Sequence, residues 1–124
     1  MKFCTAINCM DGRIQTAVIE YLKKRFDAPW VDNITEAGPN LVLAERTNPH
    51  LVDSILGRLQ ISIELHGSIS IAVVGHHDCA RNPAEKAQQL EHTRHAVEFI
   101  KQQYDNLQVI GLWVNENWEV EEVE

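Results

Sequence analysis

The stretch ISIAVVGHHDC, residues 69–79, decides the fold, because it joins an apolar run to residue types that bind metals. Residues 69–74 are apolar at almost every position, which predicts a parallel strand that is covered on both faces. Gly75, His76 and Cys79 follow where that strand ends. Because open α/β sheets place their ligand sites at the carboxyl ends of the strands, the stretch predicts both such a sheet and the position of a site on it.

The rest of the chain alternates between predicted strands and predicted helices, without internal repeats or low-complexity linkers. The predicted strands span residues 2–8, 30–34, 69–74 and 107–114, and the predicted helices span residues 14–26, 41–46, 48–67 and 82–104. Asn48-Pro49 and Asn82-Pro83 each supply an N-cap followed by proline at the first helical position. The alternation predicts an α/β fold, a three-layer domain with a central, mostly parallel four-stranded sheet and right-handed crossovers.

The length and composition fit one domain, residues 1–124, that can bury a hydrophobic core. The chain has 124 residues, 44% of them hydrophobic, and a domain near this size hides roughly two thirds of its unfolded surface. The formal net charge of −7 comes without a basic stripe, which argues against nucleic acid or an anionic membrane as a partner. Part of this charge lies in an acidic tail from about residue 115, which we expect to be a solvated end.

No segment predicts membrane insertion or export. No apolar stretch approaches the ~20 residues that span a bilayer, and the N-terminus shows neither a signal nor a transit pattern. Three cysteines, an odd number, indicate reduced thiols rather than a disulfide framework. We therefore expect a cytoplasmic protein.

A second cysteine motif, CMDGR at residues 9–13, follows the first predicted strand. If the first and third strands are parallel, Cys9 emerges at the same edge of the sheet as His76 and Cys79. Zinc favours thiolate and imidazole ligands, and the spacing of His76 and Cys79 lets one turn deliver two of them. Two thiolates and one imidazole leave the fourth position open for water, as in catalytic zinc sites.

Asp11 and Arg13 alternate with Cys9, so that in an extended segment the three side chains would point the same way. An arginine beside an aspartate keeps it ionised and fixes its orientation with a two-pronged hydrogen bond. Asp11 would then accept a hydrogen bond from zinc-bound hydroxide, or it would ligate the zinc itself and close the site. The residues leave both arrangements open.

The order Cys-x-Asp-x-Arg followed by Gly-His-x-x-Cys resembles the signature of the β-class carbonic anhydrases, and the similarity covers most of the chain. The resemblance implies a parallel α/β sheet and a homodimer or higher homo-oligomer. It implies that Cys9, His76 and Cys79 bind Zn2+ and that Asp11 and Arg13 form a catalytic dyad. The implied activity is zinc-dependent, reversible hydration of carbon dioxide to bicarbonate by metal-bound hydroxide.

Three departures from the family pattern bear on this activity. Ala80 and Arg81 follow the second zinc cysteine, where the family usually has glycine, and the family's Arg-Asn-Ala-Gly segment is TEAG here, residues 35–38. The sequence also starts almost at the first predicted strand, without the family's N-terminal helical arm. Two alternatives therefore stay open: a catalytically weak or inactive zinc-binding protein with a binding or regulatory role, or hydrolysis of a related small electrophile such as carbonyl sulfide or carbon disulfide.

The sequence that follows the first predicted strand excludes two other classes of site. A cysteine phosphatase needs five residues between cysteine and arginine, whereas Arg13 stands only four positions after Cys9. A dinucleotide-binding module needs a glycine-rich turn after the first strand, and CMDGR is not such a turn.

Four further residues have weaker expectations attached to them. His77 is the nearest candidate for a proton relay, with a surface position as the alternative. His92 and His95 are expected on a solvated helix face, and Cys4 in the core.

Several apolar residues are expected to pack against the sheet or against a second copy of the chain. Residues 48–65 carry more apolar side chains than one buried stripe requires, which with the family resemblance predicts a dimer. Trp113 and Trp118 are candidates for such a contact, or for core or surface packing. In the last predicted helix, the side chains expected to face the sheet are Leu90, Val97, Ile100 and Tyr104.

Overall fold

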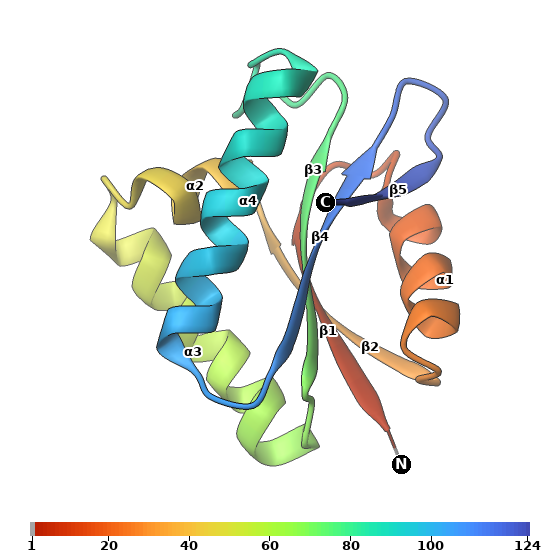
Figure 1. Cartoon of the computed structure of the whole chain (residues 1–124), viewed down its shortest axis with the longest axis vertical. Helices are drawn as coiled ribbons and strands as arrows, with labels where there is room; N and C mark the ends of the chain where they lie inside the picture. Colours follow the sequence, from red (N-terminus) through yellow and green to blue (C-terminus); the bar gives the residue numbers. More distant parts are fainter. Residues whose placement is uncertain (1) are drawn as a thin grey trace.

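The computed structural model describes residues 2–124, which form a five-stranded sheet with helices against both faces (Figure 1). The strands are β1 (Phe3–Cys9), β2 (Trp30–Glu36), β3 (Ser70–His76), β4 (Gln108–Val114) and β5 (Val120–Val123), and the helices are α1 (Gln15–Arg25), α2 (Pro39–Glu45), α3 (Pro49–His66) and α4 (Lys86–Gln103). α1 lies alone on one face of the sheet, whereas α2, α3 and α4 lie on the other. This is the predicted three-layer α/β architecture.

The strand order β2-β1-β3-β4-β5 places the two cysteine motifs on neighbouring strands. β1 pairs in parallel with β2 and with β3, and β3 pairs in parallel with β4. Thr5 lies opposite Ile71 and Ile7 lies opposite Val73, so the carboxyl ends of β1 and β3 lie side by side. Every residue of β3 is buried, as its apolar sequence predicts.

The predicted strand number, four, is wrong, because the acidic tail supplies a fifth strand. β5 pairs antiparallel with β4. Its neighbouring glutamates form ion pairs with different helices: Glu121 with Lys86 at 3.5 Å and Glu122 with Arg25 at 2.8 Å. A short edge strand tolerates charged side chains, and they protect its open edge from further pairing. The charge that suggests a solvated end is therefore compatible with a strand.

The helix α3 begins and ends as the sequence predicts. Asn48 is the N-cap, and its Oδ1 accepts a hydrogen bond from the N–H of Leu51 at 3.3 Å. Pro49 is the first helical residue, and Gly67 ends the helix with a φ of 68°, a left-handed conformation that glycine adopts without steric cost. No helix within residues 2–124 is long and apolar enough to cross a membrane.

The helix α4 differs from its prediction at its start and on its buried face. It begins at Lys86 rather than at Asn82, because the side chain of Asn82 is buried and hydrogen-bonded elsewhere. Of the side chains predicted to face the sheet, Ile100 is buried and Val97 and Tyr104 are partly buried against the same core cluster, whereas Leu90 is only half-buried. The buried residues of α4 are Gln89, Thr93, Ala96 and Ile100. Polar side chains therefore occupy part of the face that packs against the sheet.

Candidate metal centre

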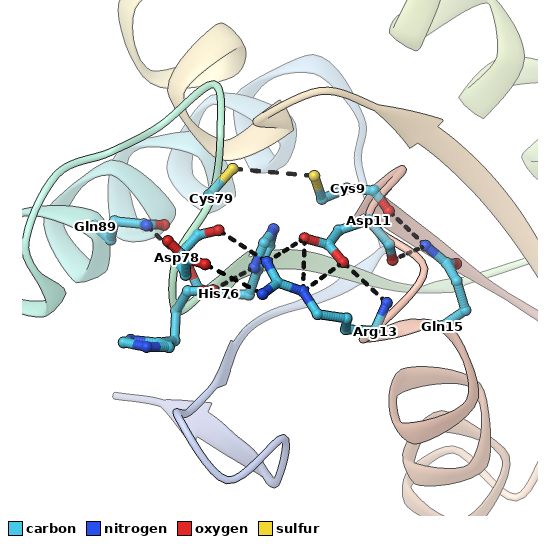
Figure 2. Close-up of polar contacts among 9 residues, drawn as sticks. Cys9, Asp11, Arg13, Gln15, His76, Asp78, Cys79 and Gln89 are labelled. Carbon is cyan, nitrogen blue, oxygen red and sulfur yellow. Dashed lines mark hydrogen bonds and ion pairs between the residues drawn. The ribbon is translucent and has the colours of Figure 1, made fainter.

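Three donor side chains converge where β1 and β3 end (Figure 2). Cys9 is the last residue of β1 and His76 is the last residue of β3, which runs two residues further than predicted, while Cys79 follows in the next turn. The Sγ atoms of Cys9 and Cys79 are 4.0 Å apart, and the donor atoms of all three residues lie within 4.8 Å of one another. The structure therefore brings together the three predicted ligands, in a buried group that could hold a metal ion.

The imidazole of His76 presents a nitrogen that has no hydrogen-bond partner. Its Nδ1 lies 2.8 Å from the carbonyl oxygen of His77, and because a carbonyl only accepts, Nδ1 carries the hydrogen. Nε2 then holds a lone pair, and it is buried without a partner among the described residues. Burial of an unpaired polar atom is costly, and metal-binding histidines use this arrangement, with one nitrogen on a carbonyl and the other on the metal. The residues present therefore fit a metal ion.

The two thiols of the group favour a thiolate. The contact with Cys79 lowers the pKa of Cys9 to about 4, and the same contact raises the pKa of Cys79. Backbone N–H groups also stabilise negative charge on the sulfurs, that of Gly38 on Cys9 and that of Arg81 on Cys79. Because the thiolate is the form that binds metals, the contact between the two sulfurs prepares Cys9 as a ligand, whereas Cys79 would lose its proton when a metal binds.

Asp11 and Arg13 form a forked ion pair beside the three donors (Figure 2). Arg13 Nε donates to Asp11 Oδ1 at 3.0 Å, and Arg13 Nη2 donates to Oδ2 at 2.7 Å. The hydrogen bonds from Arg13 lower the pKa of Asp11 to about 2, so the carboxylate is ionised at neutral pH. Both carboxylate oxygens are bonded to Arg13, and the metal-binding group found among residues 2–124 does not include Asp11.

The geometry of this pair arises from a turn and not from the predicted extended segment. β1 ends at Cys9, and residues 12–14 form a turn before α1. The backbone N–H of Arg13 donates to Asp11 Oδ1 at 2.9 Å, the pattern in which an aspartate side chain stabilises a turn two residues ahead. The two-pronged hydrogen bond is as predicted, whereas the extended segment expected from the alternation of residues 9, 11 and 13 is not formed.

Two residues outside the predicted site, Asp78 and Trp118, also contact Arg13. Arg13 Nη1 donates to Asp78 Oδ2 at 3.1 Å, and Nη2 donates to the carbonyl oxygen of Asp78 at 3.0 Å. The guanidinium also lies over the indole ring of Trp118, 4.5 Å from the ring centroid. Asp78 stands between the predicted ligands His76 and Cys79, a position that could have indicated its role. Nothing in the local sequence indicates the role of Trp118.

A buried polar network holds the loop that follows β3. Gln89 Nε2 donates to the carbonyl oxygens of His76 and Asn82, both at 2.9 Å, so one side chain connects both ends of this loop. Asn40 Nδ2 donates to Gln89 Oε1 at 3.2 Å, and Asn82 Nδ2 donates to Asn40 Oδ1 at 3.2 Å. The network packs against Gly75, where an added Cβ would lie 2.6 Å from Asn40 Nδ2. None of the sequence patterns described above indicates this network.

The remaining predicted histidines lie outside the donor group. His77 is exposed, and its ring lies edge-on to Trp118 with the centroids 6.2 Å apart. His92 is half-buried, and its Nδ1 accepts a hydrogen bond from Asn82 Nδ2 at 3.1 Å, so the prediction of a solvated position is wrong for this residue. His95 is exposed, as predicted.

Cys4 and Trp113 are core residues. Cys4 is fully buried in β1, as predicted, and burial raises the pKa of its thiol to about 11. Trp113 is buried in β4, so of the three alternatives for it, an oligomer contact, core packing or surface packing, the structure shows core packing.

A cavity of about 380 Å³ lies where residues 36–38 lead into α2, and its lining includes Gly38, whose N–H bonds Cys9, but none of the three donor residues. Gly38 and Arg81 both line it, together with Glu36 and Glu45. An added Cβ on Gly38 would lie 3.2 Å from the Cβ of Arg81, so Arg81 packs tightly against this turn. Arg81, where the sequence departs from the family pattern, is therefore a charged, exposed residue next to Gly38, whose N–H bonds Cys9.

The solved structures most useful for comparison share this fold at low sequence identity. A carbonic anhydrase from Glaciozyma antarctica is 17% identical, with a TM-score of 0.69 and coverage of 98% of this chain and 81% of that chain. A carbonic anhydrase from Streptococcus mutans is 20% identical, with a TM-score of 0.67 and the same coverage of 98% and 81%. The β-carbonic anhydrase CafA of Aspergillus fumigatus is 14% identical, with a TM-score of 0.51 and coverage of 99% and 75%.

Sequence comparisons bear on the family. A search of curated proteins gives no match. A family model described as "Putative carbonic anhydrase" matches residues 1–124. Because this model covers the whole sequence, the chain belongs to the carbonic anhydrase family that it describes.

Proposed function

We propose that the protein catalyses the zinc-dependent, reversible hydration of carbon dioxide to bicarbonate. The observation that carries this proposal is a donor set of two cysteines and one histidine with an ionised carboxylate, Asp11, held beside it by Arg13. Such a donor set leaves one position of a four-coordinate zinc open. Membership of the carbonic anhydrase family supports the reaction class.

Each side chain of the centre has a defined part in this reaction. Cys9, His76 and Cys79 would hold the zinc, which when bound would supply Lewis-acid chemistry and lower the pKa of a water molecule. Asp11 would accept a hydrogen bond from that water and orient it toward the carbon atom of the substrate. Arg13 holds Asp11 in this orientation with its forked hydrogen bonds. His77 is exposed next to the ligand His76 and can pass the released proton to solvent.

The metal content and the hydration rate of the same preparation test the proposal. We expect about one zinc per chain, and Cys79→Ser should lose most of it because a thiolate ligand is removed. Cys4→Ala is the matched control, since Cys4 lies in the core and outside the donor group, and it should keep its zinc. Absence of any transition metal after expression with added zinc would contradict the proposal, and 18O exchange measures the hydration.

A pair of variants tests the roles of Asp11 and Arg13. In Arg13→Ala, Asp11 is free to bind zinc, so we expect full zinc content with little activity at any pH. In Asp11→Ala the fourth position stays open, and some activity should return at high pH, where hydroxide forms without help. If the two variants behave alike across the pH range, the pair is a structural ion pair and these roles are wrong.

One observation favours the alternative of a weak or inactive enzyme. Arg81 packs against Gly38 at the cavity, next to the turn that bonds Cys9, where the family usually has glycine. Stoichiometric zinc without carbon dioxide hydration would support a binding or regulatory role, and turnover of carbonyl sulfide in its place would support the related hydrolysis.

We also propose that residues 1–124 act as one domain and form a homodimer in the cytoplasm. Ile61 and Leu65 on α3 are 54% and 76% exposed, and apolar side chains grouped on a surface are typical of a contact. Leu65→Glu should then give a monomer with unchanged zinc content. A sedimentation mass of one chain for the wild type at micromolar concentration would contradict the dimer.

A further inference from the structure

Trp118 has a backbone conformation that a bulky residue seldom adopts. Its φ is 60°, in the left-handed region, which is costly for a residue with a Cβ atom. The turn between β4 and β5 imposes it: Trp118 N–H donates to the carbonyl oxygen of Asn115, and Asn115 Oδ1 accepts from the N–H groups of Asn117 and Glu119. Strained residues of this kind concentrate at functional sites, so the contacts of the side chain are informative.

The indole ring of Trp118 covers one face of the Arg13 guanidinium, at 4.5 Å from centroid to Cζ. Asp11 and Asp78 occupy the edge of the same guanidinium, so the three residues together fix its plane. The Asp78 side chain is 70% exposed, and water weakens an ion pair of that kind. The Arg13 side chain is itself 45% exposed, and the ring, which lies over the guanidinium at 4.5 Å, attracts the cation through its π electrons.

The hairpin that carries Trp118 is attached to both helical layers. Glu122 pairs with Arg25 of α1, and Glu121 pairs with Lys86 of α4. Asn115 Nδ2 also donates to Glu121 Oε2 at 2.9 Å, which connects the strand to the turn. The ring is therefore presented to Arg13 by a hairpin with two ion pairs to the helices and one hydrogen bond within it.

We propose that Trp118 is a positioning residue, whose ring holds Arg13 in the orientation that keeps Asp11 paired with Arg13 and away from the metal. This inference rests on the proposed function for the roles of Asp11 and Arg13. It assigns a role to the tail, whose acidic sequence suggested only a solvated end. When the ring is removed, Arg13 can rotate, and Asp11 is released toward the fourth position of the metal.

The test compares Trp118→Gly with Trp118→Phe in cobalt-substituted protein. Glycine removes the ring but adopts a φ of 60° freely, so the turn is kept, whereas phenylalanine restores an aromatic face. Glu119→Ala in the same turn is the control, because the contribution of Glu119 to the turn is a backbone N–H. The readout is the binding of thiocyanate at a fixed pH, followed in the visible spectrum of cobalt, since thiocyanate needs the position that a released Asp11 would fill.

We expect Trp118→Gly to bind thiocyanate roughly 2- to 30-fold more weakly, the range for loss of a cation–π contact, with cobalt content unchanged. Trp118→Phe should recover most of the loss, and Glu119→Ala should match the wild type. Adding Asp11→Ala to Trp118→Gly should restore the affinity of Asp11→Ala alone, because no carboxylate remains to close the site. Equal affinity in the wild type and Trp118→Gly overturns the proposal, as does a loss that neither Trp118→Phe nor Asp11→Ala corrects.

Arg13→Ala separates failure of this inference from failure of the proposed function. If Arg13→Ala weakens thiocyanate binding and Trp118→Gly does not, the roles of Asp11 and Arg13 stand and only the role of Trp118 is wrong. If Arg13→Ala binds thiocyanate like the wild type, or if the wild type binds no metal, the proposed function fails and this inference fails with it.

Discussion

Replacement of Gln89 by leucine tests whether the buried network holds the loop between His76 and Asn82. Gln89 is 1% exposed, and its Nε2 donates to the carbonyl oxygens of both residues at 2.9 Å. Leucine fills nearly the same space but donates to neither carbonyl. Each buried group that loses its partner costs roughly 1 to 3 kcal/mol, so we expect the free energy of unfolding to fall by about 2 to 6 kcal/mol.

The same variant should also release zinc faster. His76 lies at one end of the loop and Cys79 lies within it, so loosening the loop moves two of the three proposed ligands. Loss of residues that orient metal ligands weakens metal binding by roughly 10- to 100-fold. Urea unfolding of the metal-free protein measures the stability, and transfer of zinc to a coloured chelator, below the unfolding transition, measures its release.

Gln88→Leu is the matched control, because Gln88 is the exposed neighbour of Gln89 on the same helix. Its free energy of unfolding should stay within about 0.5 kcal/mol of the wild type. If Gln89→Leu also stays within that range, its hydrogen bonds do not stabilise the fold. If it unfolds more easily but releases zinc at the wild-type rate, the network supports the fold without positioning the loop, and the reasoning about the ligands is refuted.

Three other predictions concern stability in the metal-free protein, measured by urea unfolding. Asn48→Ala removes the acceptor for an N–H in the first turn of α3 and should cost about 1 kcal/mol. Gly75→Ala brings a Cβ to 2.6 Å from Asn40 Nδ2 and should lower the free energy of unfolding by about 1 to 3 kcal/mol. Its control is Gly57→Ala, which should stabilise the protein slightly, because Gly57 is an exposed helical residue where an added Cβ meets nothing within 4 Å. The pKa of Asp11 is lowered from 3.8 to about 2, so its ionised form stabilises the fold above roughly pH 4. This contribution is lost as the pH falls toward about 2, and Asp11→Asn should flatten that part of the pH dependence of stability.

The parts of the fold that the sequence predicts correctly are specified by neighbouring residues. Asn48-Pro49 and Gly67 define the ends of α3 through backbone preferences that act whatever the helix packs against. The run at residues 70–74 is buried on both faces, as its sequence predicts, which places β3 inside the sheet, whereas Ile69 precedes the strand and is exposed. The donor group follows with one more step, because parallel neighbours end at the same edge.

The start of α4 was predicted wrongly because the side chain of Asn82 can either cap a helix or join the buried network. Asn82 before Pro83 has the local features of an N-cap, but its amide bonds Asn40 and His92, which are distant in sequence. Gln89 escapes prediction for a related reason, since helical periodicity treats a polar residue as exposed. Buried polar residues are stable only as a satisfied network, and the members of such a network become apparent only when the fold brings them together.

The acidic tail shows why charge composition alone fails to predict an edge strand. Successive residues of a strand point to opposite faces of the sheet, so Glu121 and Glu122 reach α4 on one side and α1 on the other. The negative charges that suggest a solvated end are thus the groups that attach the hairpin to both layers. Because exposed ion pairs add little to global stability, their effect is better sought where the hairpin ends, at the contact of Trp118 with Arg13.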